Sequence, residues 1–181
     1  MLSKKSLTLA ALLSLSAAYA APVDPAKSQV RFGFTQMNVP VEGHFKKVAG
    51  DISFDLAKPE TGKVSLSVEL ASVDAGSPDA NEALKSKEWF DLSRFPRASF
   101  SAAGFKSLGG NKFQATGQFS LKGRTANLTV PFTARAEGNG HWLEGSFPLS
   151  RLAYKVGEGE WADVGAVADQ VQVKFKLFVP R

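Results

Sequence analysis

The stretch KFQATGQFSLKGRTANLTVPFTA, residues 112–134, carries the information that decides the fold, because hydrophobic and polar residues alternate along it. The apolar residues share one parity on each side of Lys122-Gly123: Phe113, Ala115, Gly117, Phe119 and Leu121 before it, and Leu128, Val130, Phe132 and Ala134 after it. A period of two is typical of β-strands with one dry face and one wet face. The stretch therefore predicts two strands joined by a turn, whose dry face must be covered.

The first 20 residues have the pattern of an export signal. Lys4 and Lys5 precede an apolar run at residues 7–15, and Ala18-Tyr19-Ala20 supplies the small residues of a cleavage site. The run is shorter than the roughly 20 residues that a membrane-spanning helix needs. We expect residues 1–20 to be a signal peptide, residues 21–181 to be one mature domain, and the mature protein to be periplasmic.

The composition excludes several kinds of site. The chain has no cysteine, so it forms no disulfide, no thiolate metal site and no cysteine-linked lipid anchor. The formal net charge of +5 becomes +3 once Lys4 and Lys5 are removed. Such a mild excess argues against nucleic acid as the main partner.

Six further segments alternate in the same way: residues 30–34, 41–54, 64–70, 98–104, 143–149 and 171–179. The parity changes near Lys46-Lys47, which predicts a bulge in the second of them. Pro131 predicts a local break or bulge in its strand, because proline cannot donate to a ladder. Ser77-Pro78 predicts the start of one short helix that runs to about Lys87.

Eight one-faced strands and a single short helix leave little to cover the apolar side, so the sheet must close on itself or form a sandwich. We expect an all-β fold, namely an eight-stranded antiparallel up-and-down barrel with the helix and a long loop at its open end. Such an interior is filled by side chains or holds one small ligand. Small residues at the positions predicted to face inward fit either a filled interior or a ligand cavity: Gly43, Gly50, Ala98, Ala102, Gly104, Ala115, Gly117, Ala134 and Gly145.

Alternate connections of an up-and-down barrel share an end. Residues 37–40, the helical connection, Lys122-Gly123 and residues 150–170 would therefore lie together and form the mouth. A loop as long as residues 150–170 is usually functional or disordered. The predicted lumen residues are Phe32, Phe34, Val64, Leu66, Val68, Phe100, Phe113, Phe119, Leu128, Val130, Phe132, Phe147, Leu149 and Phe175. The predicted mouth residues are Gln36, Asn81, Leu84, Trp89, Phe90, Tyr154, Trp161 and Asp163.

The patterns expected of enzymes fit poorly. Residues 157–162, GEGEWA, match a dinucleotide fingerprint formally, but they lie between antiparallel strands and two glutamates would repel a pyrophosphate. His44 and His141 are the only histidines and occur in different elements, and no G-x-S-x-G elbow is present. We expect no metal and no cofactor, and an enzyme is the weaker class.

The order of several landmarks resembles the YceI-like proteins, secreted lipocalin-like barrels that bind polyisoprenoids and related amphiphiles. The landmarks, within residues 21–181, are Gly43-His44-Phe45 with Gly50, Phe54-Asp55, Leu84 with Trp89-Phe90-Asp91, Phe95-Pro96, Phe100, Gly117, Leu121 with Gly123, and Val171. Residues 157–163 are similar to a branch of the family, some of whose members occur with cytochrome b561 domains. Gln36 and Ala83 stand where many members carry histidine, and Asn81 stands where they carry aspartate, which implies a different head-group preference.

The resemblance implies a periplasmic carrier for a polyisoprenoid or another long-chain amphiphile. Two alternatives stay open: an accessory of quinone-linked electron transfer with a membrane cytochrome as partner, and a lipid-modifying enzyme with an unrecognised carboxylate site. A homodimer is also considered.

Overall fold

The computed structural model describes residues 20–181. The predicted signal peptide lies outside this part of the chain, apart from Ala20, and stays a prediction. Within residues 20–181 the chain forms eleven strands, one α-helix and four 3-10 helices. The strands are β1 (Ala21–Pro22), β2 (Gln29–Gln36), β3 (Val39–Phe45), β4 (Val48–Ser53), β5 (Lys63–Glu69), β6 (Val73–Asp74), β7 (Arg97–Gly109), β8 (Lys112–Leu121), β9 (Arg124–Glu137), β10 (Gly140–Ser150) and β11 (Gln170–Pro180). The helices are α1 (Pro78–Lys85), η1 (Pro59–Thr61), η2 (Leu70–Ser72), η3 (Leu152–Tyr154) and η4 (Gly159–Ala162).

The hairpin predicted from residues 112–134 is present as β8 and β9, which pair from Lys112↔Thr133 to Leu121↔Arg124. Its turn places Lys122 at φ 48° and Gly123 at φ 72°. Positive φ at both central residues is the turn geometry that matches the twist of paired strands, and glycine adopts it without strain. The dry face of the hairpin is thereby held in register across both strands.

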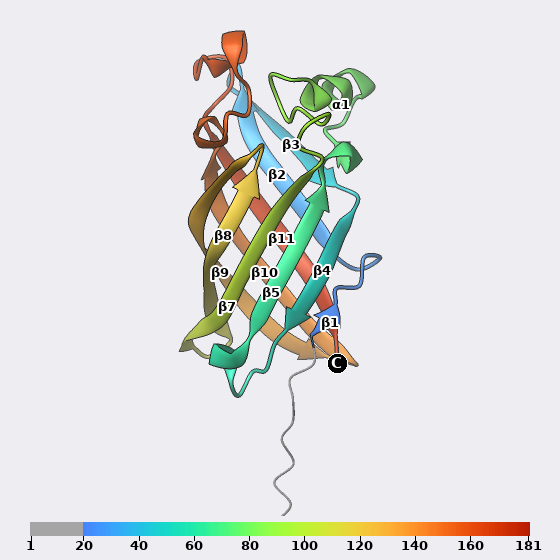
Figure 1. Cartoon of the computed structure of the whole chain (residues 1–181), viewed down its shortest axis with the longest axis vertical. Helices are drawn as coiled ribbons and strands as arrows, with labels where there is room; N and C mark the ends of the chain where they lie inside the picture. The colour runs from blue at the N-terminus through green and yellow to red at the C-terminus, as the bar shows by residue number, and fades with distance from the viewer. Residues whose placement is uncertain (1–19) are drawn as a thin grey trace, which may run out of the picture.

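All eleven strands belong to one antiparallel sheet, and the expected count of eight is wrong. The chain is interrupted at Lys46-Lys47, where one bulged strand was expected, so β3 pairs with β2 whereas β4 pairs with β5. Strands β1 and β6 have two residues each, too few to show a periodic pattern. The sheet curls around its apolar face (Figure 1).

Pro131 affects a neighbouring ladder and leaves its own strand intact. Strand β9 passes through Pro131 and keeps its register with β8. The ladder between β9 and β10, however, stops at Phe132↔Gly145, one residue before the proline. The expected break is therefore found between two strands, because proline has no N–H to offer β10.

The connections separate into two ends as the alternation predicts. Figure 1 shows the turn between β2 and β3, helix α1, the turn after β8 and the segment before β11 at one end of the sheet. Helix α1 starts at Pro78, and the Ser77 hydroxyl caps it by accepting from Ala80 N at 3.2 Å. It ends at Lys85, two residues earlier than expected. Below, "the lid" means residues 151–169 and "the helical connection" means residues 75–96.

Candidate ligand cavities and their lid

Two adjoining cavities lie inside the curled sheet. The central cavity has a volume of about 130 Å³ and the lid cavity, nearer the lid, one of about 120 Å³. Both have apolar walls, and six residues border both: Val30, Val68, Ala98, Phe119, Phe147 and Val173. An engineered apolar cavity of about 150 Å³ stays dry and binds benzene, so spaces of this size and lining suit hydrocarbon rather than water.

Most of the predicted lumen residues border these cavities. Phe32, Phe34 and Leu149 line the lid cavity, and Val68, Phe119 and Phe147 line both cavities. The central cavity is lined by Val64, Leu66, Phe100, Leu128, Val130, Phe132 and Phe175. Phe113 is buried in the interior but borders neither cavity, so its role as a ligand contact stays a prediction.

Phe113 belongs to an aromatic floor at the end of the sheet opposite the lid. Its ring is 5.3 Å from Phe54 and 5.6 Å from Phe132, while Phe105 lies 5.6 Å from Phe132 and His141 lies 6.0 Å from Phe54. Burial lowers the pKa of His141 below its ordinary value, and the charge of Arg181 adds to this effect. The floor closes the interior at this end with packed rings.

The glycines on the inward parity do not make the space. A Cβ at Gly117 would overlap the carbonyl oxygen of Ser101, and one at Gly145 would overlap that of Pro131. A Cβ at Gly43 would overlap the Phe32 ring. Glycine is therefore needed where the wall packs closely, whereas Ala98 and Ala115 do border the cavities.

The predicted mouth residues divide into two groups. Leu84, Trp89 and Phe90 are buried and line the lid cavity. The other five border neither cavity: Gln36, Asn81, Tyr154, Trp161 and Asp163. Their prediction as ligand contacts is not supported by this geometry.

Four of these five have structural contacts instead. Asn81 Oδ1 accepts from Ala75 N at 2.7 Å, and Asp163 Oδ1 accepts from Gly165 N at 2.8 Å. Gln36 forms a bridge with Val167, and the ring of Trp161 lies 5.8 Å from that of Trp89. Each contact fixes the lid or the helical connection.

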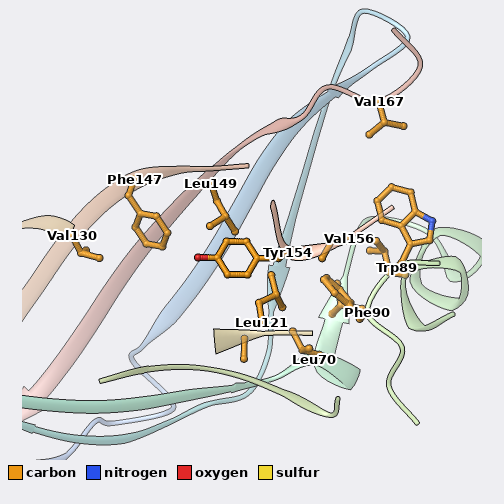
Figure 2. Close-up of a cluster of buried hydrophobic side chains, with 13 residues drawn as sticks. Leu70, Trp89, Phe90, Leu121, Val130, Phe147, Leu149, Tyr154, Val156 and Val167 are labelled. Atoms are coloured by element: carbon orange, nitrogen blue, oxygen red, sulfur yellow. The ribbon is translucent and has the colours of Figure 1, made fainter. Parts of the chain in front are cut away.

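Tyr154 is buried in the hydrophobic cluster that also holds Leu121, Leu149 and Val156 (Figure 2). Its ring packs edge-on against Phe119 at 5.3 Å, and burial raises the pKa of its hydroxyl. Arg124, at the start of β9, donates to the neighbouring Ala153 oxygen at 3.4 Å. The first turn of the lid is thus anchored on β8 and on the start of β9.

Sequence reasoning missed Arg151, which borders the lid cavity and is 2% exposed. Its guanidinium donates to the backbone oxygens of the lid at 2.6–3.0 Å: those of Val156, Gly157, Trp161, Val167 and Ala168. Burial lowers the pKa of Arg151, and nearby Asp169 opposes this effect. All five N–H groups of a guanidinium are used in this way, so the lid is folded around one side chain.

Lys122 was also missed, because it was interpreted only as a turn residue. Its buried Nζ donates to Lys155 O at 2.6 Å, to Glu158 Oε2 at 3.0 Å and to Glu88 O at 3.2 Å. Glu88 O also accepts from the backbone N–H groups of Gly157 and Glu158, at 2.8 and 2.9 Å. These bonds join the lid to the helical connection, so the long loop is ordered. No sequence pattern marks a bond to a backbone oxygen.

Within residues 20–181 no three His, Asp or Glu side chains are grouped so that they could hold a metal ion. In the same part of the chain, no helix is long and apolar enough to cross a membrane.

Comparison with known sequences gives one family. A model described as the YceI-like domain matches residues 22–179. Curated relatives named UPF0312 protein, from Azotobacter vinelandii and Pseudomonas savastanoi pv. phaseolicola, are 34% and 31% identical over 100 and 102 residues. The alignments cover 55% and 56% of this chain. The chain spans about half the length of these relatives, 52% and 53%.

Solved structures share the fold. BcnA of Burkholderia cenocepacia is 41% identical, with a TM-score of 0.84, over 87% of this chain and 99% of that chain. A domain from Saccharophagus degradans, named as polyisoprenoid binding and implicated in plant cell wall breakdown, is 16% identical, with a TM-score of 0.73, over 90% and 99% of the two chains. At 16% identity the second likeness speaks for the fold alone.

Proposed function

The chain belongs to the YceI-like family, and on that premise we propose that it carries a polyisoprenoid or another long-chain amphiphile in the periplasm, with the hydrocarbon tail in the two cavities. The observation that carries the proposal is the pair of adjoining apolar cavities between a packed floor and an ordered lid. The name of the Saccharophagus degradans domain supports the ligand class. In this proposal the curled sheet acts as a lipocalin-like barrel, and the protein binds its ligand without converting it.

Native mass spectrometry of protein purified from its own periplasm tests this function. The expected result is a bound lipid whose tail is longer than the head group, released on denaturation. Protein that returns no lipid, and that binds no long-chain probe when one is added, would contradict the carrier function. A quinone among the extracted lipids would instead favour electron transfer with a membrane cytochrome.

Export is part of the proposal and has its own test. Sequencing of the mature N-terminus should give Ala21, because Ala18-Tyr19-Ala20 precedes it. An intact Met1 on soluble periplasmic protein would contradict the signal peptide. Turnover assays on a lipid ester should give no product, and release of a free acid would favour a lipid-modifying enzyme.

A further inference from the structure

A groove of about 380 Å³ lies on the outside of the wall, over β2, β3 and β11. Three residues border both this groove and the lid cavity: Phe32, Phe34 and Val171. The wall between outside and inside is therefore one layer thick at this place. Gly33, which has no side chain, lies at the groove between the two phenylalanines.

The hydrogen-bonded seam between β2 and β11 stops beside this groove. The ladder ends at Gly33↔Gln172, although β2 continues to Gln36 and β11 begins two residues earlier, at Gln170. The two sides of the seam meet again at the bridge of Gln36 with Val167, where Thr35 O accepts from Ala168 N and Met37 N donates to Ala166 O. The stretch opposite Phe34 lacks strand pairing, so side chains rather than a ladder separate the groove from the cavity.

Two other routes to the cavities are obstructed. At the start of β9, the first turn of the lid is held on the sheet by buried Tyr154, which packs against Phe119, and by Arg124, which donates to Ala153 O. Over the open end, the lid is fixed by Arg151 and is joined to the helical connection by Lys122. A tail that enters beside Phe34 has to displace side chains, whereas one that enters under the lid has to break these hydrogen bonds.

The groove is also positively charged at its border. Arg31 and Lys174 are both exposed and stand directly opposite each other in the ladder of β2 with β11. Like charges in this position destabilise a sheet. Of the ion pairs found among residues 20–181, none includes either side chain. Glu42 is the one carboxylate on the groove, and it faces Gly33 across the β2–β3 ladder.

We propose that this groove is the head-group site for an anionic amphiphile, whose tail passes between β2 and β11 beside Phe34 into the lid cavity. A phosphate or carboxylate head group would relieve the repulsion between Arg31 and Lys174 by charge-assisted hydrogen bonds. The inference rests on the proposed carrier function and adds the charge of the ligand and its route.

The charge of the head group is tested with two probes of equal tail length, dodecyl phosphate and 1-dodecanol. The Arg31→Gln/Lys174→Gln double variant should lose at least tenfold in affinity for dodecyl phosphate and change less than twofold for 1-dodecanol. The Lys63→Gln/Lys112→Gln variant is the matched control, because it removes two exposed cations that are also absent from the ion pairs of the described residues. It should bind both probes as the wild type does.

The route is tested by filling the groove. A Cβ at Gly33 would meet only Val41 O at 3.7 Å and Glu42 Cγ at 3.8 Å, which are ordinary contacts, so Gly33→Leu should fold. Stopped-flow association of both probes should slow at least fivefold in Gly33→Leu. Ala103→Leu, which adds bulk at an exposed position of β7, should associate at the wild-type rate.

The results can distinguish failure of the head-group site or of the route from failure of the proposed carrier function. Wild type that binds neither probe would contradict the carrier function. If the wild type binds both probes and the Arg31→Gln/Lys174→Gln variant keeps full affinity for dodecyl phosphate, the anionic head-group site is overturned. The carrier function would then still stand. An unchanged association rate in a folded Gly33→Leu variant would overturn the route between β2 and β11.

Discussion

Ala115 and Gly117 are two residues apart on β8 and share a face, yet only Ala115 borders a cavity. Ala115→Leu should therefore fill part of the central cavity at a cost below about 1 kcal/mol, with affinity for 1-dodecanol lower by tenfold, or about 1.4 kcal/mol. Urea unfolding and probe titration measure the two effects. A loss of stability without a loss of affinity would contradict a hollow interior.

Gly117→Val serves as the contrasting variant. Its side chain has no space, because the Cβ alone would overlap Ser101 O, so we expect a loss of at least about 2 kcal/mol in the free energy of unfolding. From the sequence alone the two positions looked equivalent. Periodicity shows which way a residue points but not how closely the next strand approaches it.

His141 makes the stability depend on pH. Burial keeps its pKa below the ordinary value in the folded protein, with Arg181 adding to the shift and Asp55 opposing it. The unfolded chain then binds more protons, so the stabilisation is fully present above the unfolded pKa of about 6.5 and is lost as the pH falls toward the folded pKa. The melting temperature of the wild type should fall more than that of His141→Gln between about pH 8 and about pH 5. Equal slopes for wild type and His141→Gln would contradict this role.

At the scale of the element, the fold of the lid depends on the side chain of Arg151. Arg151→Met would leave five lid carbonyls without their donor, and we expect a loss of about 3 kcal/mol or more in the free energy of unfolding. Arg151→Lys should lose less, since an ammonium still offers three donors. Arg124→Met removes one exposed bond and should cost less than about 0.5 kcal/mol. Hydrogen exchange of the lid amides would check that the loss begins there, and unchanged protection in Arg151→Met would contradict the role.

The elements predicted from the sequence were those with a long run of alternating residues or with a defined helix cap. The β8–β9 hairpin and the start of α1 are examples, because alternation and a Ser-Pro cap have direct structural causes. The lid was predicted only as a long loop. Its order comes from Arg151 and Lys122, whose partners are backbone oxygens that every residue carries.

The candidate site was predicted in the same uneven way. The cavity walls followed from parity, and Trp89 and Phe90 followed from the placement of the helical connection at the mouth. Asn81 and Asp163, predicted as ligand contacts, accept hydrogen bonds from nearby backbone N–H groups, as short polar side chains commonly do in turns. The outer groove had no sequence signal, because it depends on where one ladder ends.

For the molecule as a whole, the pairing of β2 with β11 joins the two ends of the chain, whereas β7, β8, β9, β10 and β11 follow one another as sequential neighbours. Contacts between distant segments form late in folding, because the intervening chain must be ordered before they are gained. In pulsed hydrogen exchange during refolding, the amides of β8 and β9 should become protected before those of β2. Earlier protection of β2 would contradict this order.

That order has a consequence for when the protein can first be loaded. Val30, Phe32 and Phe34 of β2 and Val171, Val173 and Phe175 of β11 border the cavities, so the walls stay incomplete until the C-terminal strand arrives. In the proposed carrier, a chain whose β11 has not yet paired with β2 would offer a lipid only a partial sheet. Loading would therefore wait until β11 joins the sheet.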